Sequence, residues 1–435
     1  MQLPLTDPET LFEELLQDLP PETVQMAREF KAFVRAKKVK TPAQLLRVVF
    51  LYCGLDKSLR EVAGTFTALY ESMTDQAVAE RLRACGPWVK AMLRRMLPLS
   101  AVDTLPQGRR FVVIDASSIQ APGATGTDHR LHIAMDWVSL QFLEVFVSDV
   151  HTGETLKHFT LAPGDVAVAD RGYAHCQGMS AAIQQGADLI VRLNPFSVVL
   201  CDAVGVPLEL CAVLKRQPME TLRTLAVALC ATGGQHEVRG WVHAYRLNAE
   251  HANRARHKCR QGHKKGTPTA ESLLLAGWVL VCTTLAPAVL SAQTIMALYR
   301  CRWQVEMAIK RWKSVLDVDA LRAKAHSPLA AVWLHGKLLY ALMLERRMRR
   351  QLGDRWGRLD HERVGTWWRV WGMLKDEIAP MITGALFWKE DAWAACLKVL
   401  MERPRRRTLQ QLPPAALDVL YRCNASQQEG EPIAA

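Results

Sequence analysis

LYRCRWQVEMAIKRWKSVL, residues 298–316, carries the pattern that most constrains the architecture of this chain. Tyr299, Arg302, Glu306 and Lys313 stand in it at offsets of zero, three, seven and fourteen. On an α-helix, which turns about 100° per residue, these four side chains project within roughly 60° of one another. One helix face therefore presents an acid, two cations and a phenol, which favours a phosphodiester with a divalent ion as the ligand. The alternative is a surface helix with i,i+4 ion pairs.

Two acids upstream follow apolar runs that are typical of buried strands. Asp115 comes directly after residues 111–114 in RRFVVIDASSIQ, and Asp170 ends the run in GDVAVADRGYAH, just before Gly172. We expect the two strands to carry these acids to the rim of a sheet, near Glu306. Three carboxylates of this kind could hold two Mg²⁺ or Mn²⁺ ions about 3.5 to 4 Å apart, the arrangement that supports in-line displacement at phosphorus.

Other acids compete for the same role. Candidates stand in the predicted strands DHRLHIAMDW and QFLEVFVSDV, in the APGD turn and in HTGETL, and they are Asp128, Asp136, Asp149, Asp165 and Glu154. An Asp at a strand end is most often a turn residue, and only Asp115 directly follows a continuous apolar strand. Glu154 is expected as a solvated turn residue, with a supporting role beside the metal-binding acids as the alternative.

The strand Asp, the second Asp in a DRGY motif and the Tyr-x2-Arg-x3-Glu-x6-Lys helix together resemble bacterial insertion-sequence transposases. These are DDE recombinases with a ribonuclease-H-like catalytic core. The resemblance covers roughly residues 110–316 and includes GETLKHFTLAPGDVAVADRGYAH and GWVLVCTTL. It implies that Asp115, Asp170 and Glu306 are the catalytic, metal-binding triad. It also implies DNA contacts by Tyr299, Arg302 and Lys313, to which we add Arg171 beside the second Asp.

The resemblance implies a DNA transposase that uses Mg²⁺ or Mn²⁺ to cleave insertion-sequence ends and transfer them into target DNA. Its partners would be double-stranded DNA, as terminal repeats and as target, and a second copy of the chain in the DNA complex. A bacterial cytoplasmic, nucleoid-associated location follows. One alternative is a ribonuclease-H-like structure-selective nuclease or resolvase. Another is a non-catalytic DNA-binding relative, although decay would not be expected to spare all three acids and the whole helix pattern.

Composition is compatible with these expectations. The chain has 435 residues, of which 49% are hydrophobic and 23% charged, as in globular proteins with room for two to four domains. Its formal net charge of +12 favours a polyanion partner, either nucleic acid or an acidic membrane surface. The eleven cysteines include no Cys-x2-Cys pair, so we expect a reducing compartment and no zinc site.

The uncharged stretch from Ser272 to Tyr299 could be mistaken for a membrane span. A span needs about 20 apolar residues in one continuous helix, and here Gly, Thr and Pro interrupt the run. We predict instead a buried strand from Trp278 to Thr283, then a turn, and a helix that begins with Ser291 as its N-cap. No membrane association is expected.

We predict a mixed α+β and α/β fold in four regions. Residues 1–100 are helical, with a capping box at Ser58 and Glu61, and two short helices around it could form a helix-turn-helix for DNA ends or simply pack. Residues 101–194 and 270–325 form the ribonuclease-H-like core. Residues 195–269 form a β-rich insertion, and residues 326–435 a helical region that could pair two protomers.

The insertion ends in HANRARHKCRQGHKKG, where eight of the twelve positions from Arg254 to Lys265 are Arg, Lys or His. We expect a flexible basic loop beside the catalytic site that contacts DNA phosphates, since neutralising phosphates releases condensed counterions. The alternative is a basic surface loop without a function. The expected DNA-contacting residues are Arg254, Arg256, Lys258, Arg260, Lys264 and Lys265.

Overall fold

The computed structural model describes residues 8–97, 109–231, 237–262, 267–353, 364–365, 367–384 and 401–402. Its helices are α1 (Pro8–Leu16), α2 (Thr23–Glu29), α3 (Pro42–Val49), η1 (Phe50–Gly54), α4 (Leu59–Leu69), α5 (Asp75–Ala84), α6 (Gly86–Met96), η2 (Leu156–His158), η3 (Arg171–Tyr173), α7 (Cys176–Gln184), α8 (Leu210–Leu214), α9 (Ala249–Gly262), α10 (Ala270–Leu275), α11 (Ala292–Cys301), α12 (Trp303–Leu316), α13 (Pro328–Leu352) and α14 (Trp367–Thr383). Its strands are β1 (Arg110–Ile119), β2 (His129–Asp136), β3 (Phe142–Asp149), β4 (Asp165–Ala169), β5 (Asp188–Arg192), β6 (Val199–Cys201), β7 (Leu222–Cys230), β8 (Glu237–Arg246), β9 (Trp278–Thr283), β10 (Val364–Gly365) and β11 (Met401–Glu402).

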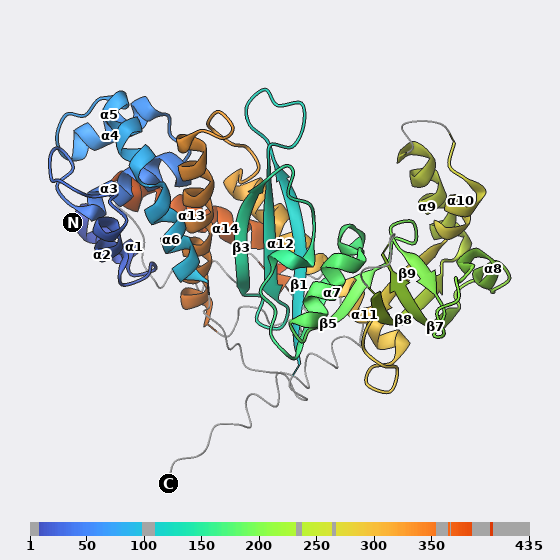
Figure 1. Cartoon of the computed structure of the whole chain (residues 1–435). Coiled ribbons are helices and arrows are strands. Elements are labelled where there is room, and N and C mark those ends of the chain that lie inside the picture. The colour runs from blue at the N-terminus through green and yellow to red at the C-terminus, as the bar shows by residue number, and fades with distance from the viewer. Residues whose placement is uncertain are drawn as a thin grey trace, which may run out of the picture.

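One nine-stranded sheet runs through the molecule in the order β3-β2-β1-β4-β5-β9-β8-β7-β6 (Figure 1). Strand β4 pairs in parallel with β1 and with β5, and the other pairings are antiparallel. The expected mixture of α and β structure is confirmed. The strands of the expected insertion do not form a sheet of their own, because β8 pairs with β9 and so extends the sheet of the core.

Alternating residues of β1 face two different helical layers, as the period of two in a strand requires. Phe111 and Val113 join the core cluster that includes α12 and α13, whereas Val112 and Ile114 join the cluster that includes α7. Asp115 continues the first series, so its side chain lies on the sheet face that α12 covers. The alternation of β1 therefore directs this acid toward the helix of Glu306.

The parallel register between β1 and β4 brings the two strand acids to neighbouring positions. Ile114 pairs with Ala169, so Asp115 and Asp170 occupy the next position on each strand. Strand β4 ends there, but β1 continues to Ile119 and pairs with β2 alone. The expectation that Asp115 ends its strand is therefore wrong, because β2 supplies hydrogen-bond partners beyond the end of β4.

The N-terminal helices and the long helix α13 form a bundle at one end of the sheet (Figure 1). The capping box at the start of α4 is confirmed, since Ser58 and Glu61 each accept a hydrogen bond from the other's backbone amide. Helices α4 and α5 contact one another and bury Val62, Phe66 and Leu82 in the core cluster shared with α13. These contacts support packing as one role of the pair, and a role in DNA binding stays a prediction.

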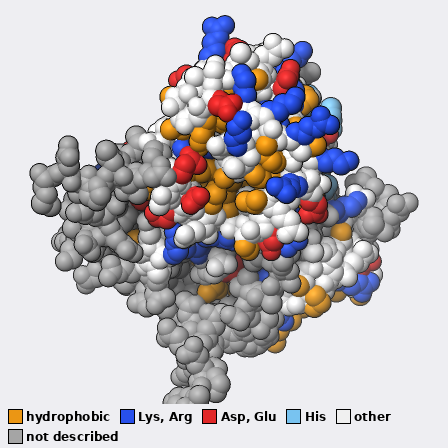
Figure 2. Space-filling model, turned by 90° about the vertical axis from the view of Figure 1, so that its left-hand side faces the viewer, with side chains coloured by type: hydrophobic (Ala, Val, Ile, Leu, Met, Phe, Trp, Pro, Cys, Tyr) orange, Lys and Arg blue, Asp and Glu red, His pale blue; other side chains and the backbone are white. Residues whose placement is uncertain are grey.

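The outer face of this bundle carries many charges. Figure 2 shows Lys and Arg side chains gathered toward one side of the face, with a hydrophobic area between them and a group of acids. Most residues of helix α13 are buried, because the N-terminal helices cover it on one side and β3 lies on another. Within the described residues, none of the helices is long and apolar enough to cross a membrane.

The basic segment at the end of the expected insertion is a helix for most of its length. Helix α9 continues to Gly262, so the prediction of a flexible loop is wrong for Arg254, Arg256, Lys258 and Arg260. Ala, Arg, Lys and Gln are good helix formers, which explains why this charged run folds as a helix. Lys264 and Lys265 lie outside the described residues.

Candidate active site

The four-residue pattern spans two helices that meet at Arg302. Helix α11 begins after Ser291, whose side chain accepts a hydrogen bond from the Thr294 amide, so the expected N-cap is confirmed. Arg302 ends α11 and precedes α12 with φ −49° and ψ −27°, so the prediction of one continuous helix is wrong at this position. Glu306 consequently lies in the first turn of α12, where the helix dipole favours a negative charge.

The Arg302 guanidinium joins an acid of the sheet to an acid of the helix. Its Nη1 lies 3.3 Å from Oδ2 of Asp115, and its Nη2 donates a hydrogen bond to Oε1 of Glu306. The second oxygen of Glu306, Oε2, lies 3.7 Å from Nζ of Lys310. Arg302 and Asp115, which are 187 positions apart in the chain, thus form a largely buried ion pair.

Asp115 lies in an environment that disfavours its negative charge. Burial raises the pKa of its carboxyl to about 7, and the nearby Asp170 and Glu306 add to the increase. Arg302 and the Ala116 amide, which donates to Oδ1 over 2.9 Å, act in the opposite direction. A carboxyl whose charge is so poorly solvated gains from an additional cation, which favours a metal ion at this position.

Asp170 caps the short turn η3. Its Oδ1 accepts a hydrogen bond from the Gly172 amide over 2.8 Å, which fixes the carboxyl just past the end of β4, beside the middle of β1. Arg171 is exposed at the same turn. The sheet register and this cap together explain how two acids from separate strands come to adjoin one another.

The other residues of the helix pattern differ in their surroundings. Tyr299 is 9% exposed, and the Arg302 guanidinium lies 5.9 Å from the centre of its ring. Nζ of Lys313 lies 3.4 Å from Oδ2 of Asp319. The geometry thus brings Tyr299 and Arg302 close to the acids, whereas Lys313 is paired one turn before the end of α12. Their contacts with DNA stay predictions.

The competing acids accept hydrogen bonds from their own turns. Asp128 accepts from the Ala121 amide, Asp136 from Ser139, Asp149 from Thr152, and Asp165 from the Ala162 amide and Arg110. These contacts support the interpretation of all four as turn or structural residues. Glu154 differs from them, because it is half-buried, pairs with Arg130 and lies against Gly172.

Two polar groups near the acids were not found by sequence reasoning. Lys310 pairs with Glu306 and lies over the Trp303 ring at 4.8 Å. Tyr173 is fully buried, and within the described structure its hydroxyl has no hydrogen-bond partner. The position of Tyr173, three residues after Asp170 in the DRGY motif, was the available signal.

The carboxylate oxygens suit a hard divalent cation. Mg²⁺ and Mn²⁺ prefer oxygen ligands, and the raised pKa of Asp115 marks an acid that a cation would stabilise. No group of three or more His, Cys, Asp and Glu side chains in the described part of the chain is already arranged to hold a metal ion. Arg302 lies between Asp115 and Glu306, so it has to release them before both can bind an ion.

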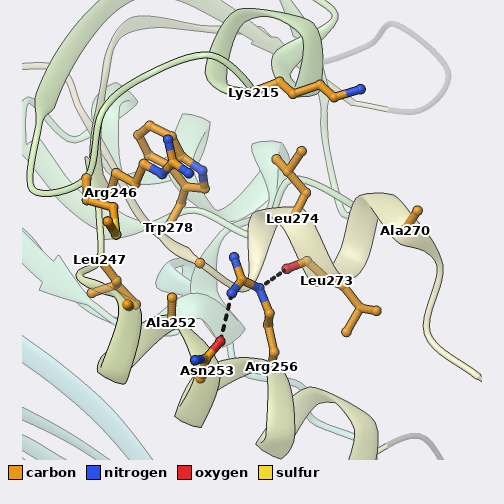
Figure 3. A pocket seen from close by; sticks show the side chains of 13 residues that line it. Lys215, Arg246, Leu247, Ala252, Asn253, Arg256, Ala270, Leu273, Leu274 and Trp278 are labelled. Atoms are coloured by element: carbon orange, nitrogen blue, oxygen red, sulfur yellow. Dashed lines mark hydrogen bonds between the residues drawn. The ribbon is translucent and has the colours of Figure 1, made fainter.

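The cations of the insertion gather around a pocket of about 410 Å³. Figure 3 shows Arg246 and Trp278, which pair across β8 and β9, on one wall and Arg256 of α9 on another, with Lys215 at the rim. Arg256 is held by hydrogen bonds from Nε to the Leu273 carbonyl and from Nη1 to the Asn253 side chain.

This pocket is not adjacent to the acids. Strand β8 lies four strands from β1 in the sheet order, a separation of about 19 Å at ordinary strand spacing. The remaining cations of α9 point elsewhere: Arg254 pairs with Glu250 in the preceding turn, and Lys258 and Arg260 are exposed. The expectation of a basic element directly beside the catalytic acids therefore does not describe α9.

Sequence comparisons with known proteins show the family of this chain. Residues 106–342 match the family model described as "Transposase DDE domain". The putative transposase InsL for insertion sequence element IS186A of Escherichia coli (strain K12) is 30% identical over 335 residues, which cover 75% of this chain and 90% of that protein. The transposase for insertion sequence element IS421 of Escherichia coli is 30% identical over 336 residues with the same coverage. The transposase for insertion sequence element IS231C of Bacillus thuringiensis subsp. berliner is 22% identical over 432 residues, which cover 87% of this chain and 88% of the relative.

Proposed function

The chain belongs to the DDE transposase family, and on that premise we propose that Asp115, Asp170 and Glu306 form its catalytic triad. It is a DNA transposase, an enzyme that cleaves DNA and transfers strands. The observation that carries the assignment is the single guanidinium of Arg302, which contacts Asp115 and Glu306 while the sheet register sets Asp170 beside them. A ribonuclease-H-like core agrees with this arrangement of central strands and a carboxylate-bearing helix.

Both chemical steps use the same acids. In the first, the oxygen of a water attacks phosphorus at the end of the element, and the 3′ oxygen leaves as a hydroxyl. In the second, that hydroxyl attacks a phosphorus of the target and displaces a target 3′ oxygen. Two Mg²⁺ or Mn²⁺ ions, when bound, supply the activation of the attacking oxygen and the stabilisation of the leaving oxygen. Asp115, Asp170 and Glu306 would hold these ions through their carboxylate oxygens.

The cations and the phenol of the two helices position the DNA. Arg302, freed from the acids, offers a planar pair of donors that suits a phosphate, and Lys313 adds a mobile positive charge. The Tyr299 hydroxyl donates to the same backbone. Arg171, exposed beside Asp170, contacts the strand that passes the second acid. Together they neutralise the phosphate as its charge shifts in the transition state.

The pocket of the insertion binds a DNA backbone phosphate at a distance from the reacting one. Lys215, Arg246 and Arg256 come from three separate segments, and among the residues that the structure describes no acid lines the pocket with them. Lys258 and Arg260 extend the positive surface along α9. A duplex that reaches from the acids to this pocket covers the width of four strands, which suits the flank of a transposon end.

Two copies of the chain acting together would hold the two ends of one element. Strand transfer requires both ends at one target site, so a homodimer in the DNA complex suits this reaction. The terminal repeats of the element and the target duplex are the two DNA partners. Enzymes that act on these partners in bacteria work on the nucleoid, in the cytoplasm.

The triad is tested by replacing Asp170 with Asn in the full chain. The carboxamide keeps the shape of the side chain but is a far weaker ligand for Mg²⁺. We expect Asp170→Asn to bind a labelled terminal-repeat duplex as the wild type does and to lose cleavage by at least a thousandfold, on the order of catalytic-group deletions. Asp149→Asn, in a turn, is the matched control. Cleavage by Asp170→Asn within tenfold of wild type would remove this residue from the triad.

A further inference from the structure

A fourth carboxylate lies beside the proposed triad. The position that a Cβ atom on Gly172 would occupy is 2.0 Å from Oε2 of Glu154 and 3.1 Å from Oδ1 of Asp170. Both distances are measured from one point, so these two carboxylate oxygens are no more than 5.1 Å apart. A side chain at position 172 would have to displace the Glu154 carboxylate, so glycine at this position leaves the space that the carboxylate occupies beside the end of β4.

The partners of Glu154 leave much of its charge uncompensated. Oε1 lies 3.7 Å from Nη1 of Arg130, and the side chain of Glu154 is 33% exposed. The Asp170 carboxylate is the other charged group beside Glu154. Two carboxylates at this separation repel one another unless a proton or a cation lies between them. The arrangement favours a cation at the Asp170 side of Glu154.

Tyr173 supplies an independent observation at the same place. Its side chain is fully buried, and among the described residues no group accepts a hydrogen bond from its hydroxyl. Burial raises its pKa well above the ordinary value, and the charges of Asp115, Glu154 and Asp170 add to the increase, so the phenol lies within electrostatic range of all three acids. A buried hydroxyl without a hydrogen-bond partner destabilises a protein, because it has lost its bonds to water. One explanation for the unpartnered hydroxyl is a bound ion that moves the neighbouring carboxylates into hydrogen-bond range.

We propose that Glu154 is a fourth carboxylate ligand of the catalytic centre, shares a divalent ion with Asp170, and is oriented there by the hydroxyl of Tyr173. This inference rests on the proposed triad and adds a residue from outside its three motifs. In the protein without ions, Arg130 takes the place of the cation beside Glu154, as Arg302 does between Asp115 and Glu306. When an ion draws Glu154 and Asp170 together, a carboxylate oxygen becomes the acceptor that the Tyr173 hydroxyl lacks.

The test measures Mn²⁺ binding to the full chain without DNA, from the electron paramagnetic resonance signal of free Mn²⁺. Glu154→Gln should weaken binding of one ion by about ten- to a hundredfold, as changes around metal ligands commonly do. Glu237→Gln is the matched control, because Glu237 is likewise a partly exposed acid paired with an arginine. Glu154→Gln that folds and binds Mn²⁺ like the wild type overturns the proposal.

A second variant separates an ion ligand from a merely structural ion pair. If Glu154 only stabilises Arg130, then Arg130→Met and Glu154→Gln should share one defect, and that result overturns the proposal. If Glu154 binds an ion, Arg130→Met removes a competing cation and should bind Mn²⁺ at least as tightly as the wild type. Mn²⁺ binding by Arg130→Met therefore also tests the role of Glu154 if Glu154→Gln does not fold.

Tyr173→Phe tests the positioning role. Removing an unpartnered buried hydroxyl should leave the ion-free unfolding temperature unchanged or higher, while Mn²⁺ affinity falls severalfold. Equal Mn²⁺ affinity in Tyr173→Phe and wild type contradicts that role. Asp170→Asn distinguishes failure of the triad from failure of the fourth ligand. If Asp170→Asn still binds Mn²⁺, the proposed triad is contradicted. If Asp170→Asn loses Mn²⁺ binding while Glu154→Gln binds Mn²⁺ like the wild type, only the role of Glu154 is contradicted.

Discussion

Arg302 and Asp115 form an ion pair across the junction between the sheet and the helices, with 3.3 Å between Nη1 and Oδ2. Because the same guanidinium also contacts Glu306, it occupies the space that a cation would take between two acids of the triad. Arg302 neutralises both acids in the structure. On the proposed mechanism it would become available to a DNA phosphate once ions replace it.

Arg302→Gln should therefore have opposite effects on two ligands. Without the competing guanidinium, the free protein should bind Mn²⁺ severalfold more tightly, since a competitor for the same oxygens is gone. Binding of the terminal-repeat duplex should weaken by about 1 to 3 kcal/mol, the range for losing a hydrogen bond to a charged group. Titrations with Mn²⁺ and with labelled DNA measure the two effects, with Arg239→Gln, an exposed arginine paired with Glu237, as control. Unchanged Mn²⁺ affinity would show that Arg302 does not compete with ions.

Asp115 should make the stability of the ion-free protein depend on pH. Its pKa is about 7 in the folded chain and about 3.9 when unfolded, so the folded state binds more protons between these values. Stability from this group is therefore fully present below about pH 4 and is lost as pH rises through 7. When the pH is raised from 5 to 8, the free energy of unfolding should fall in both proteins. The fall should be about 1 to 3 kcal/mol smaller for Asp115→Asn than for the wild type.

Thermal unfolding in a chelator at both pH values measures this difference. The comparison between proteins cancels the contributions of all other titrating groups that the substitution leaves alone. Asp136→Asn is a second variant for comparison with Asp115→Asn. Burial also raises the pKa of Asp136, but its carboxyl accepts hydrogen bonds in a turn with Ser139 and is not part of the proposed triad. An identical pH dependence of wild type and Asp115→Asn would contradict the assignment of a raised pKa to Asp115.

Lys337 and Asp56 hold the N-terminal helices against α13. The Lys337 side chain is fully buried and donates to Asp56 and to the Gly54 carbonyl, while the Trp333 indole also donates to Asp56. Asp56→Ala leaves a buried cation without its partner and should destabilise the protein by about 3 to 5 kcal/mol.

Adding Lys337→Met to Asp56→Ala should recover part of that loss, because the unpaired charge is gone. Denaturant or thermal unfolding of the single and double variants gives the coupling between the two residues. Additive losses would mean that the pair does not connect the N-terminal helices to α13 energetically.

The pocket of the insertion should contribute to the salt dependence of DNA binding. Lys215→Ala combined with Arg246→Ala removes up to two phosphate contacts, which should flatten the slope of log K against log salt by about 2. Affinity should fall to a similar degree for different flanking sequences. Arg239→Ala, on the same strand as Arg246 but paired with Glu237, is the control. An unchanged slope in the double variant would exclude the pocket from the DNA path.

Local sequence signals predicted much of the fold. Ser58 and Ser291 were identified as helix caps, and Trp278 to Thr283 as a strand, because capping and continuous apolar runs depend only on near neighbours. The acids Asp115 and Asp170 were singled out by the same reasoning, since each directly follows an apolar run in the sequence.

The features that sequence reasoning missed depend on distant contacts or on a choice between local states. The break at Arg302 carries no Gly or Pro signal, and the pairing of β8 with β9 is set by the whole sheet. Charge was taken as evidence for a loop at Arg254 to Arg260, although Arg and Lys are good helix formers. The approach of Glu154 to Gly172 requires the folded chain, because nothing near Glu154 in the sequence indicates Asp170.

Strand transfer tests the central claim most directly. Purified protein with Mg²⁺ or Mn²⁺, a labelled duplex bearing the element's own terminal repeat and a supercoiled target is compared with Asp115→Asn, Glu306→Gln and the turn control Asp128→Asn. Joined products from the wild type and Asp128→Asn, lost in the other two while they still bind the duplex, are the expected result. Joined products from Asp115→Asn or Glu306→Gln at the wild-type level would contradict the assigned triad.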